Sequence, residues 1–160
     1  MFRRSARAMK KNERISAFVH QLGANPALAL DPRYQGYFTC FNGQQYYEAH
    51  DVLENLWLER RDEHHLFFKG LIQLAGAFVH LQKQFVHPTH PKHGRRLRPA
   101  VRLFQLAAKN LAAFAPRHLQ LDVAALLQLC ERQAAEIIAG QYESNPWQPA
   151  QAPQIHLLAK

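Results

Sequence analysis

Apolar residues recur every three or four positions in five stretches of the chain, which is the pattern of helices with one buried face. The predicted helices cover about residues 12–23, 42–60, 62–85, 99–115 and 122–140. The third is apolar on nearly every side, as is typical of a helix packed against several neighbours. No stretch predicts a strand. We therefore expect an all-α fold, a single-domain irregular bundle of about five helices with a central buried helix.

Capping and turn residues mark the ends of these helices. Asn42 with Gln45 three residues later predicts a capping box at the start of the second helix. The Asn-Pro pair at 25–26 and the Asp-Pro pair at 31–32 predict an irregular connection before it. Aromatic side chains would hold this connection against the core, namely Tyr34, Tyr37, Phe38 and Phe41.

The chain divides into three parts by composition. Residues 1–11 are expected to form a basic N-terminal arm, and residues 12–143 the helical domain. Residues 144–160 hold three prolines and predict an irregular tail, which Trp147 would dock onto the domain.

The net charge of +8 is unevenly distributed. Basic residues crowd the N-terminus, the second helix is acidic, and no acidic residue occurs between His64 and Leu121. Such segregation concerns the electric field and the partners of a protein rather than its fold. Two distant cysteines fit a reducing compartment, and no apolar stretch is long enough to span a bilayer. We therefore expect a cytoplasmic protein without a membrane partner.

The second predicted helix carries polar side chains beside its apolar stripe. On a helical wheel, Tyr47, His50 and Glu54 form a polar seam along one edge of that stripe. Asp51 lies further round the helix, and Glu48 lies on the other flank, nearer to solvent. An ionisable group at the boundary of a core is costly to bury unless it has a partner, so the seam is the first candidate site.

The third predicted helix supplies polar groups that can complete this site. Gln73 and His80 are seven positions apart and therefore share one face. If the two helices pair in antiparallel fashion, His50 and Glu54 can meet that face. His50, Glu54 and His80 would then be three ligands of a divalent metal ion that activates water, with the other four polar residues around them.

Two other interpretations fit the same residues. His50, Glu54, Gln73 and His80 can form a buried hydrogen-bond network that only sets the register of the helices. Alternatively, His50 and Glu54 can transfer a proton in a pocket without metal.

Two segments resemble signatures of the DUF309 family. The first is Phe41-Asn42 followed by Tyr47-Glu48-Ala49-His50-Asp51-Val52-Leu53-Glu54 and Trp57; the second is Phe68-Lys69-Gly70-Leu71-Ile72-Gln73-Leu74-Ala75 followed by His80. Together they cover about residues 41–111. The resemblance implies an all-helical fold, and family members are sometimes labelled predicted metal-dependent hydrolases.

A basic cluster before the fourth helix departs from the family pattern. Lys92, Arg95, Arg96 and Arg98 lie close to the start of that helix, where backbone N–H groups also attract anions. Together with the basic arm they are compatible with a site for phosphate or nucleic acid, although a run of charges is usually a solvated face. His87, His90 and His93 lie in the same loop; a His-rich tract can bind metal, but a solvated loop is the favoured explanation of these residues.

Three functions therefore remain open from the sequence. The protein is a metal-dependent hydrolase of unknown substrate, a non-enzymatic module that binds an anionic partner such as nucleic acid, or a helical homo-oligomer whose polar cluster is structural.

Overall fold

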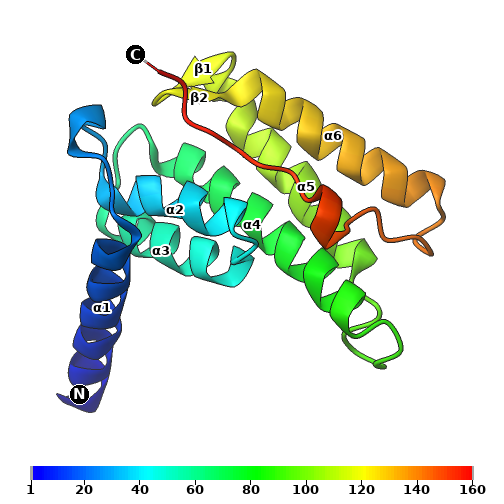
Figure 1. Ribbon diagram of the computed structural model, residues 1–160, viewed down its shortest axis with the longest axis horizontal. Helices are drawn as coiled ribbons and strands as arrows, with labels where there is room; N and C mark the ends of the chain where they lie inside the picture. Colours follow the sequence, from blue (N-terminus) through cyan, green and yellow to red (C-terminus); the bar gives the residue numbers. More distant parts are fainter. Residues whose placement is uncertain (1, 160) are drawn as a thin grey trace.

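The helices are seen in a computed structural model that describes the backbone of residues 2–159 and the side chains of residues 10–159. Its α-helices are α1 (Phe2–Leu22), α2 (Pro32–Asn42), α3 (Tyr46–Glu59), α4 (His65–Val86), α5 (Leu97–Leu111) and α6 (Val123–Ala139) (Figure 1). Single 3-10 turns are Pro26–Leu28, Ala112–Phe114 and Pro149–Gln151. The all-α, single-domain fold is confirmed. No described helix combines the length and apolarity needed to cross a membrane.

Helix α4 is the central element of the bundle. It packs against α3 on one side and α5 on another, while α2 packs on α3 and α6 on α5. Phe67, Leu74 and Phe78 of α4 are fully buried, as its apolar sequence predicted.

The connection between the first two predicted helices contains a helix, α2, which is a correction to the expected irregular segment. Asp31 is its N-cap and accepts a hydrogen bond from the Arg33 N–H at 2.8 Å, and Pro32 occupies the first helical position. The Asp-Pro pair therefore starts a helix instead of only breaking one. The aromatic side chains of α2 are buried, as expected.

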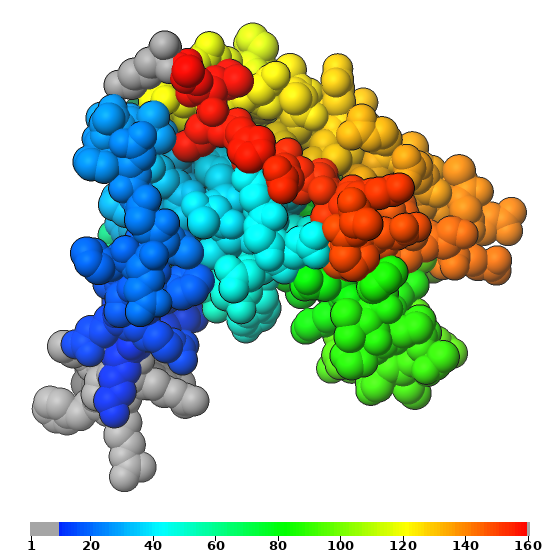
Figure 2. Space-filling model, in the orientation of Figure 1, coloured from blue at the N-terminus to red at the C-terminus, as the bar shows by residue number. Residues whose placement is uncertain are grey.

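The C-terminal tail crosses one face of the bundle (Figures 1 and 2). Trp147 is buried and its indole N–H donates to the Tyr46 hydroxyl at 3.0 Å, so the expected docking is confirmed. The capping box is wrong. Asn42 ends α2, and its side-chain amide holds the tail by donating to the Ile155 carbonyl at 2.9 Å and accepting from the Ile155 N–H at 2.7 Å.

Two further elements differ from the expectation. Strands β1 (Arg117–His118) and β2 (Leu121–Asp122) form a minimal antiparallel pair between α5 and α6 where no strand was predicted. Helix α1 begins at Phe2 instead of about residue 12, so the backbone of the predicted arm continues into this helix. Its C-terminal half packs on α3 through Ile15 and Val19, and its N-terminal half projects from the body (Figure 1). The side chains of residues 1–9 lie outside the described ones.

Candidate functional site

The polar seam on α3 forms as the helix period predicted. The Nδ1 atom of His50 lies 3.2 Å from Asp51 Oδ1, and its Nε2 atom lies 3.6 Å from Glu54 Oε2. The Tyr47 ring stacks on the imidazole, with 6.3 Å between ring centroids. All these partners come from α3 itself, and the His50 side chain is 31% exposed. His50 is therefore paired with carboxylates at the surface of one helix.

The acidic side chains of α3 line grooves that α1 closes on the other side. Asp51 and Glu54 line a groove of about 260 Å³ together with Lys11 of α1. Asp51 also lines a neighbouring groove of about 320 Å³ with Tyr47, Glu48 and Arg14. Acidic residues of α3 thus face basic residues of α1 across partly open space, and among the described residues no histidine lines either groove.

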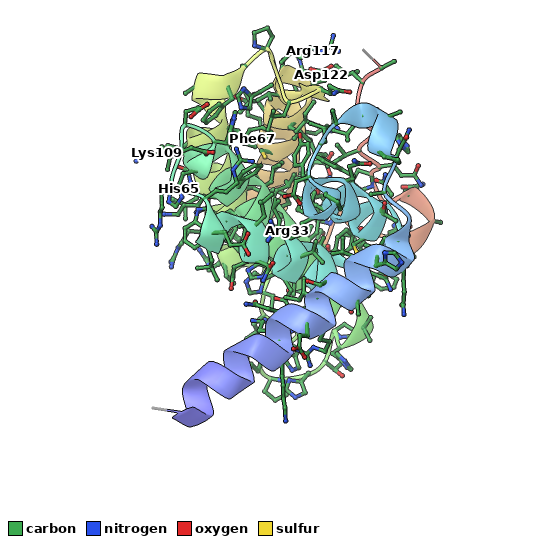
Figure 3. All side chains as sticks on the ribbon, turned by 90° about the vertical axis from the view of Figure 1, so that its left-hand side faces the viewer. Arg33, His65, Phe67, Lys109, Arg117 and Asp122 are labelled. Carbon is green, nitrogen blue, oxygen red and sulfur yellow. The ribbon has the colours of Figure 1, made fainter. Side chains whose placement is uncertain are left out.

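A third groove, of about 350 Å³, is lined by an ion-pair network. Arg33 contacts Asp31 at 3.1 Å and Glu59 at 2.8 Å, and its Nη1 atom donates to Asn55 Oδ1 at 2.9 Å. The Asn55 amide in turn donates to Asn12 Oδ1 of α1 at 2.8 Å. Figure 3 labels Arg33 above α1, on the body of the bundle. These contacts join α1, α2 and α3. The polar side chains in this groove therefore have a structural role, since they hold the three helices together.

The polar face of α4 is turned toward α5 and the loop that precedes it. Gln73 Oε1 accepts from the Asn110 amide of α5 at 2.7 Å. His80 Nδ1 accepts a hydrogen bond from Arg96 Nη1 at 3.1 Å. Arg96 is the residue immediately before α5. Gln73 and His80 do share a face, as predicted, but this face meets α5 instead of α3.

The predicted three-ligand metal site is consequently not assembled. Within residues 10–159, His50, Glu54 and His80 are not among the groups whose ligand atoms lie within 4.8 Å of one another. His50 and Glu54 are on the α3 surface, whereas His80 belongs to the α4–α5 contact. The residues therefore do not fit one metal ion. The alternative of one hydrogen-bond network also needs correction, because the contacts are separate pairs: His50 with Glu54, Gln73 with Asn110, and His80 with Arg96.

Arg96 is the centre of the predicted basic cluster. Its guanidinium donates to His80 Nδ1 at 3.1 Å, and its Nε atom donates to His93 Nδ1 at 3.1 Å. Burial, followed by the charges of Arg96 and Lys83, lowers the pKa of His80 to about 4. Desolvation and Arg96 also lower the pKa of His93. At neutral pH both imidazoles are therefore uncharged acceptors that hold the guanidinium in place.

The remaining members of the cluster surround Arg96. Lys92 and Arg95 are exposed, and Arg98 places its guanidinium carbon 4.1 Å from the centroid of the Tyr142 ring. Arg96 occupies the N-cap position of α5, where no side chain accepts a hydrogen bond from the helix N–H groups. The cations thus lie beside the positive end of a helix.

One contact between two histidines was not predicted from the sequence. His64 Nδ1, in the turn before α4, lies 2.8 Å from His118 Nε2 in β1. Asp62, Glu63 and His64 also bring ligand atoms within 4.8 Å of one another. No sequence signal connects the two imidazoles, because 54 positions separate them and no strand was predicted at His118.

Comparison with known proteins shows that part of the chain is similar to one family. Residues 34–88 match the family described as Domain of unknown function (DUF309). No curated protein and no solved structure matches the chain. The matched range covers most of α2 and all of α3 and α4, including His50, Glu54 and His80, but it ends before the basic cluster. The similarity to the DUF309 family is therefore limited to residues 34–88, about a third of the chain.

Proposed function

We propose that this protein is a non-enzymatic binding module and that the end of the α4–α5 hairpin binds a nucleic acid. One observation supports this proposal above the others: cations gather at this end with no carboxylate beside them. Among the side chains of residues 10–159, the lysines and arginines within 4.0 Å of a carboxylate are Arg33 and Arg60, and both lie elsewhere. Uncompensated like charges repel each other, and phosphates of a partner would remove that repulsion.

The geometry of the hairpin end suits a phosphate backbone. Arg98 and Arg102 lie four residues apart on the exposed side of α5, and Lys92 and Arg95 are exposed on the loop before it. Arg96 is fixed by its two imidazole partners, so less side-chain freedom is lost when it binds an anion. Figure 2 shows this end projecting from the body, where an extended polymer can reach it.

The hydrolase that the family label suggests has less support from this chain. His50, Glu54 and His80 do not converge, so we derive no hydrolytic step through a metal ion. His50 and its carboxylate partners are half-buried on α3, and among the described residues no histidine lines the two grooves beside them.

The proposal is tested by binding of fluorescent single-stranded RNA and duplex DNA, followed by anisotropy between about 50 and 200 mM salt. The variant Lys92→Gln/Arg95→Gln/Arg102→Gln removes three exposed cations from the hairpin end. If each contacts one phosphate, the slope of log affinity against log salt becomes shallower by about 2–3.

A matched control removes the same charge elsewhere. Three exposed cations lie elsewhere: Arg61 in the α3–α4 turn, Lys69 near the start of α4, and Arg132 on α6. Their combined change to Gln should leave the slope close to that of the original protein. Absence of binding at the lowest salt, or equal slopes for the two triple variants, would refute the proposal, because phosphate contacts are strongest at low salt.

A further inference from the structure

Flat side chains lie among the cations of the α4–α5 hairpin end. Phe85, in the last turn of α4, is 44% exposed, and His90, in the loop that follows, is exposed as well. Binding of phosphates requires neither ring, because phosphates are bound by charge and by hydrogen-bond donors. Exposed rings beside cations are instead typical of proteins that bind single strands, whose bases stack on the rings. The two rings therefore bear on which form of nucleic acid the hairpin end binds.

The His90 ring is held in one orientation. It stacks on the His93 ring, with 4.5 Å between centroids and 29° between planes. Its Nδ1 atom accepts hydrogen bonds from the backbone N–H groups of Lys92 and His93, at 3.1 and 3.0 Å. His93 covers one face of the ring, and because His90 is exposed the opposite face is accessible. A base can stack there without first ordering the ring, which lowers the entropic cost of binding.

Two other planar groups at the hairpin end are also supported by a ring. Phe85 contacts Trp147 of the tail in a T-shaped arrangement, with 5.4 Å between ring centroids. The Arg98 guanidinium carbon lies 4.1 Å from the centroid of the Tyr142 ring, while Arg98 itself is exposed. Bases stack on guanidinium planes as well as on aromatic rings. Figure 2 shows the hairpin end (green) beside the tail (orange to red), so these groups lie where two parts of the surface meet.

The histidines of the loop present ring faces instead of a set of metal ligands. The rings of His87, His90 and His93 have centroids 4.5, 5.7 and 6.4 Å apart. Among the described side chains, however, they do not belong to a group of three whose ligand atoms lie within 4.8 Å of one another. The Nδ1 atoms of His90 and His93 also already accept hydrogen bonds. The arrangement therefore suits stacking better than metal binding.

We propose that the hairpin end binds single-stranded nucleic acid, with bases stacked on His90, Phe85 and Arg98 and phosphates on the cations around them. This inference rests on the proposed nucleic-acid function and specifies the form of the partner. The bases of a duplex are stacked on one another and cannot stack on these groups. A surface that acted by charge alone would favour the duplex, because each contact with a duplex releases more counterions than a contact with a single strand. Preference for the single strand would therefore report stacking.

The test is fluorescence anisotropy at about pH 8, where imidazoles are uncharged, with one sequence as single-stranded RNA, single-stranded DNA and duplex DNA. Both single strands should bind more tightly than the duplex. In Phe85→Leu/His90→Asn their affinity should fall by roughly 10- to 100-fold, since stacking of one base contributes about 5- to 150-fold. The salt dependence and the duplex affinity should not change, because no cation is removed. Leucine retains an apolar contact for Trp147, and asparagine retains an acceptor for the backbone N–H groups.

A matched control removes one exposed aromatic ring and one exposed imidazole elsewhere. Tyr47 lies on α3 and His20 on α1, and both are exposed. The variant Tyr47→Leu/His20→Asn should therefore bind all three nucleic acids as the original protein does. Equal losses of single-strand affinity in the two double variants would overturn the assignment of the stacking groups.

A probe without bases covers the case in which a variant fails to fold. A single strand of abasic sites retains the phosphates, so it should bind the unaltered protein with the same salt dependence but at least about tenfold more weakly than the strand with bases. A duplex bound as tightly as either single strand, or an abasic strand bound as tightly as one with bases, would overturn the stacking and leave phosphate binding intact. Absence of binding by every probe at the lowest salt would overturn the proposed function as well.

Discussion

The close approach of α4 to α5 predicts that two glycines of one helix respond oppositely to alanine. A Cβ atom added at Gly70 would lie 2.7 Å from Leu111 Cγ and 3.3 Å from the Ala107 carbonyl oxygen. Leu111 is fully buried, and Cγ is its branching carbon, so it has no free space into which to move. At Gly76 the nearest atom is Leu103 Cδ1 at 3.2 Å, the end of a side chain that is only partly buried.

The expected magnitudes follow from two opposing effects. Alanine is favoured over glycine inside a helix by about 1 kcal/mol. Overpacking at Gly70 costs about 1–3 kcal/mol, so after the helix-propensity gain Gly70→Ala should lower the free energy of unfolding by up to about 2 kcal/mol. Gly76→Ala should leave the free energy of unfolding unchanged or raise it by up to about 1 kcal/mol, because the Leu103 methyl group can move.

Urea unfolding of both variants and of a Leu111→Ala background measures these effects. Leu111→Ala alone should cost about 2–5 kcal/mol. In that background the clash is absent and the new methyl group fills part of the cavity, so Gly70→Ala should become stabilising. If Gly70→Ala has the same sign in both backgrounds, or stabilises as Gly76→Ala does, the packing argument is wrong.

Two further predictions concern the tail and the buried imidazole. Asn42→Ala removes both hydrogen bonds to Ile155 and should lower the free energy of unfolding by about 1–3 kcal/mol, with faster proteolysis of the tail; a proteolysis rate equal to that of the original protein would contradict this. His80 has a pKa of about 4 when folded, against an ordinary 6.5, so the unfolded chain binds more protons between these values. The stability that neutral His80 contributes is therefore present above about pH 6.5 and lost as the pH falls toward 4. Urea unfolding at pH 7, 5 and 4 should show a weaker pH dependence for His80→Gln, and equal dependence in both proteins would refute the assignment.

The helices show where sequence periodicity succeeds and where it fails. Helices α3, α5 and α6 were predicted because each has a polar side that contrasts with its apolar side, and α4 because its apolar residues continue over a length typical of a buried helix. Helix α2 was missed because consecutive residues from Tyr34 to Phe38 are all buried, which leaves no such contrast. Its Asp-Pro start also resembles a turn, and only the neighbours around it show that a helix follows.

The candidate site residues also show which contacts the sequence can predict and which it cannot. Tyr47, His50 and Glu54 lie together because their distances are set by the geometry of a single helix. The shared face of Gln73 and His80 was also predictable, but not the neighbour that this face meets. Helix α4 packs against α3 on one side and α5 on another. Its own sequence does not specify which of its faces contacts which of these two helices.

The amino-acid order alone therefore determined the helical class, the uneven charge and the contacts within each helix, since these depend on residues a few positions apart. Only the packing of the chain decided that His80 meets Arg96, that Asn42 holds the tail, and that His64 meets His118. Those contacts join residues between 16 and 113 positions apart, where no local periodicity acts and where the choice of partner depends on how the helices pack in three dimensions.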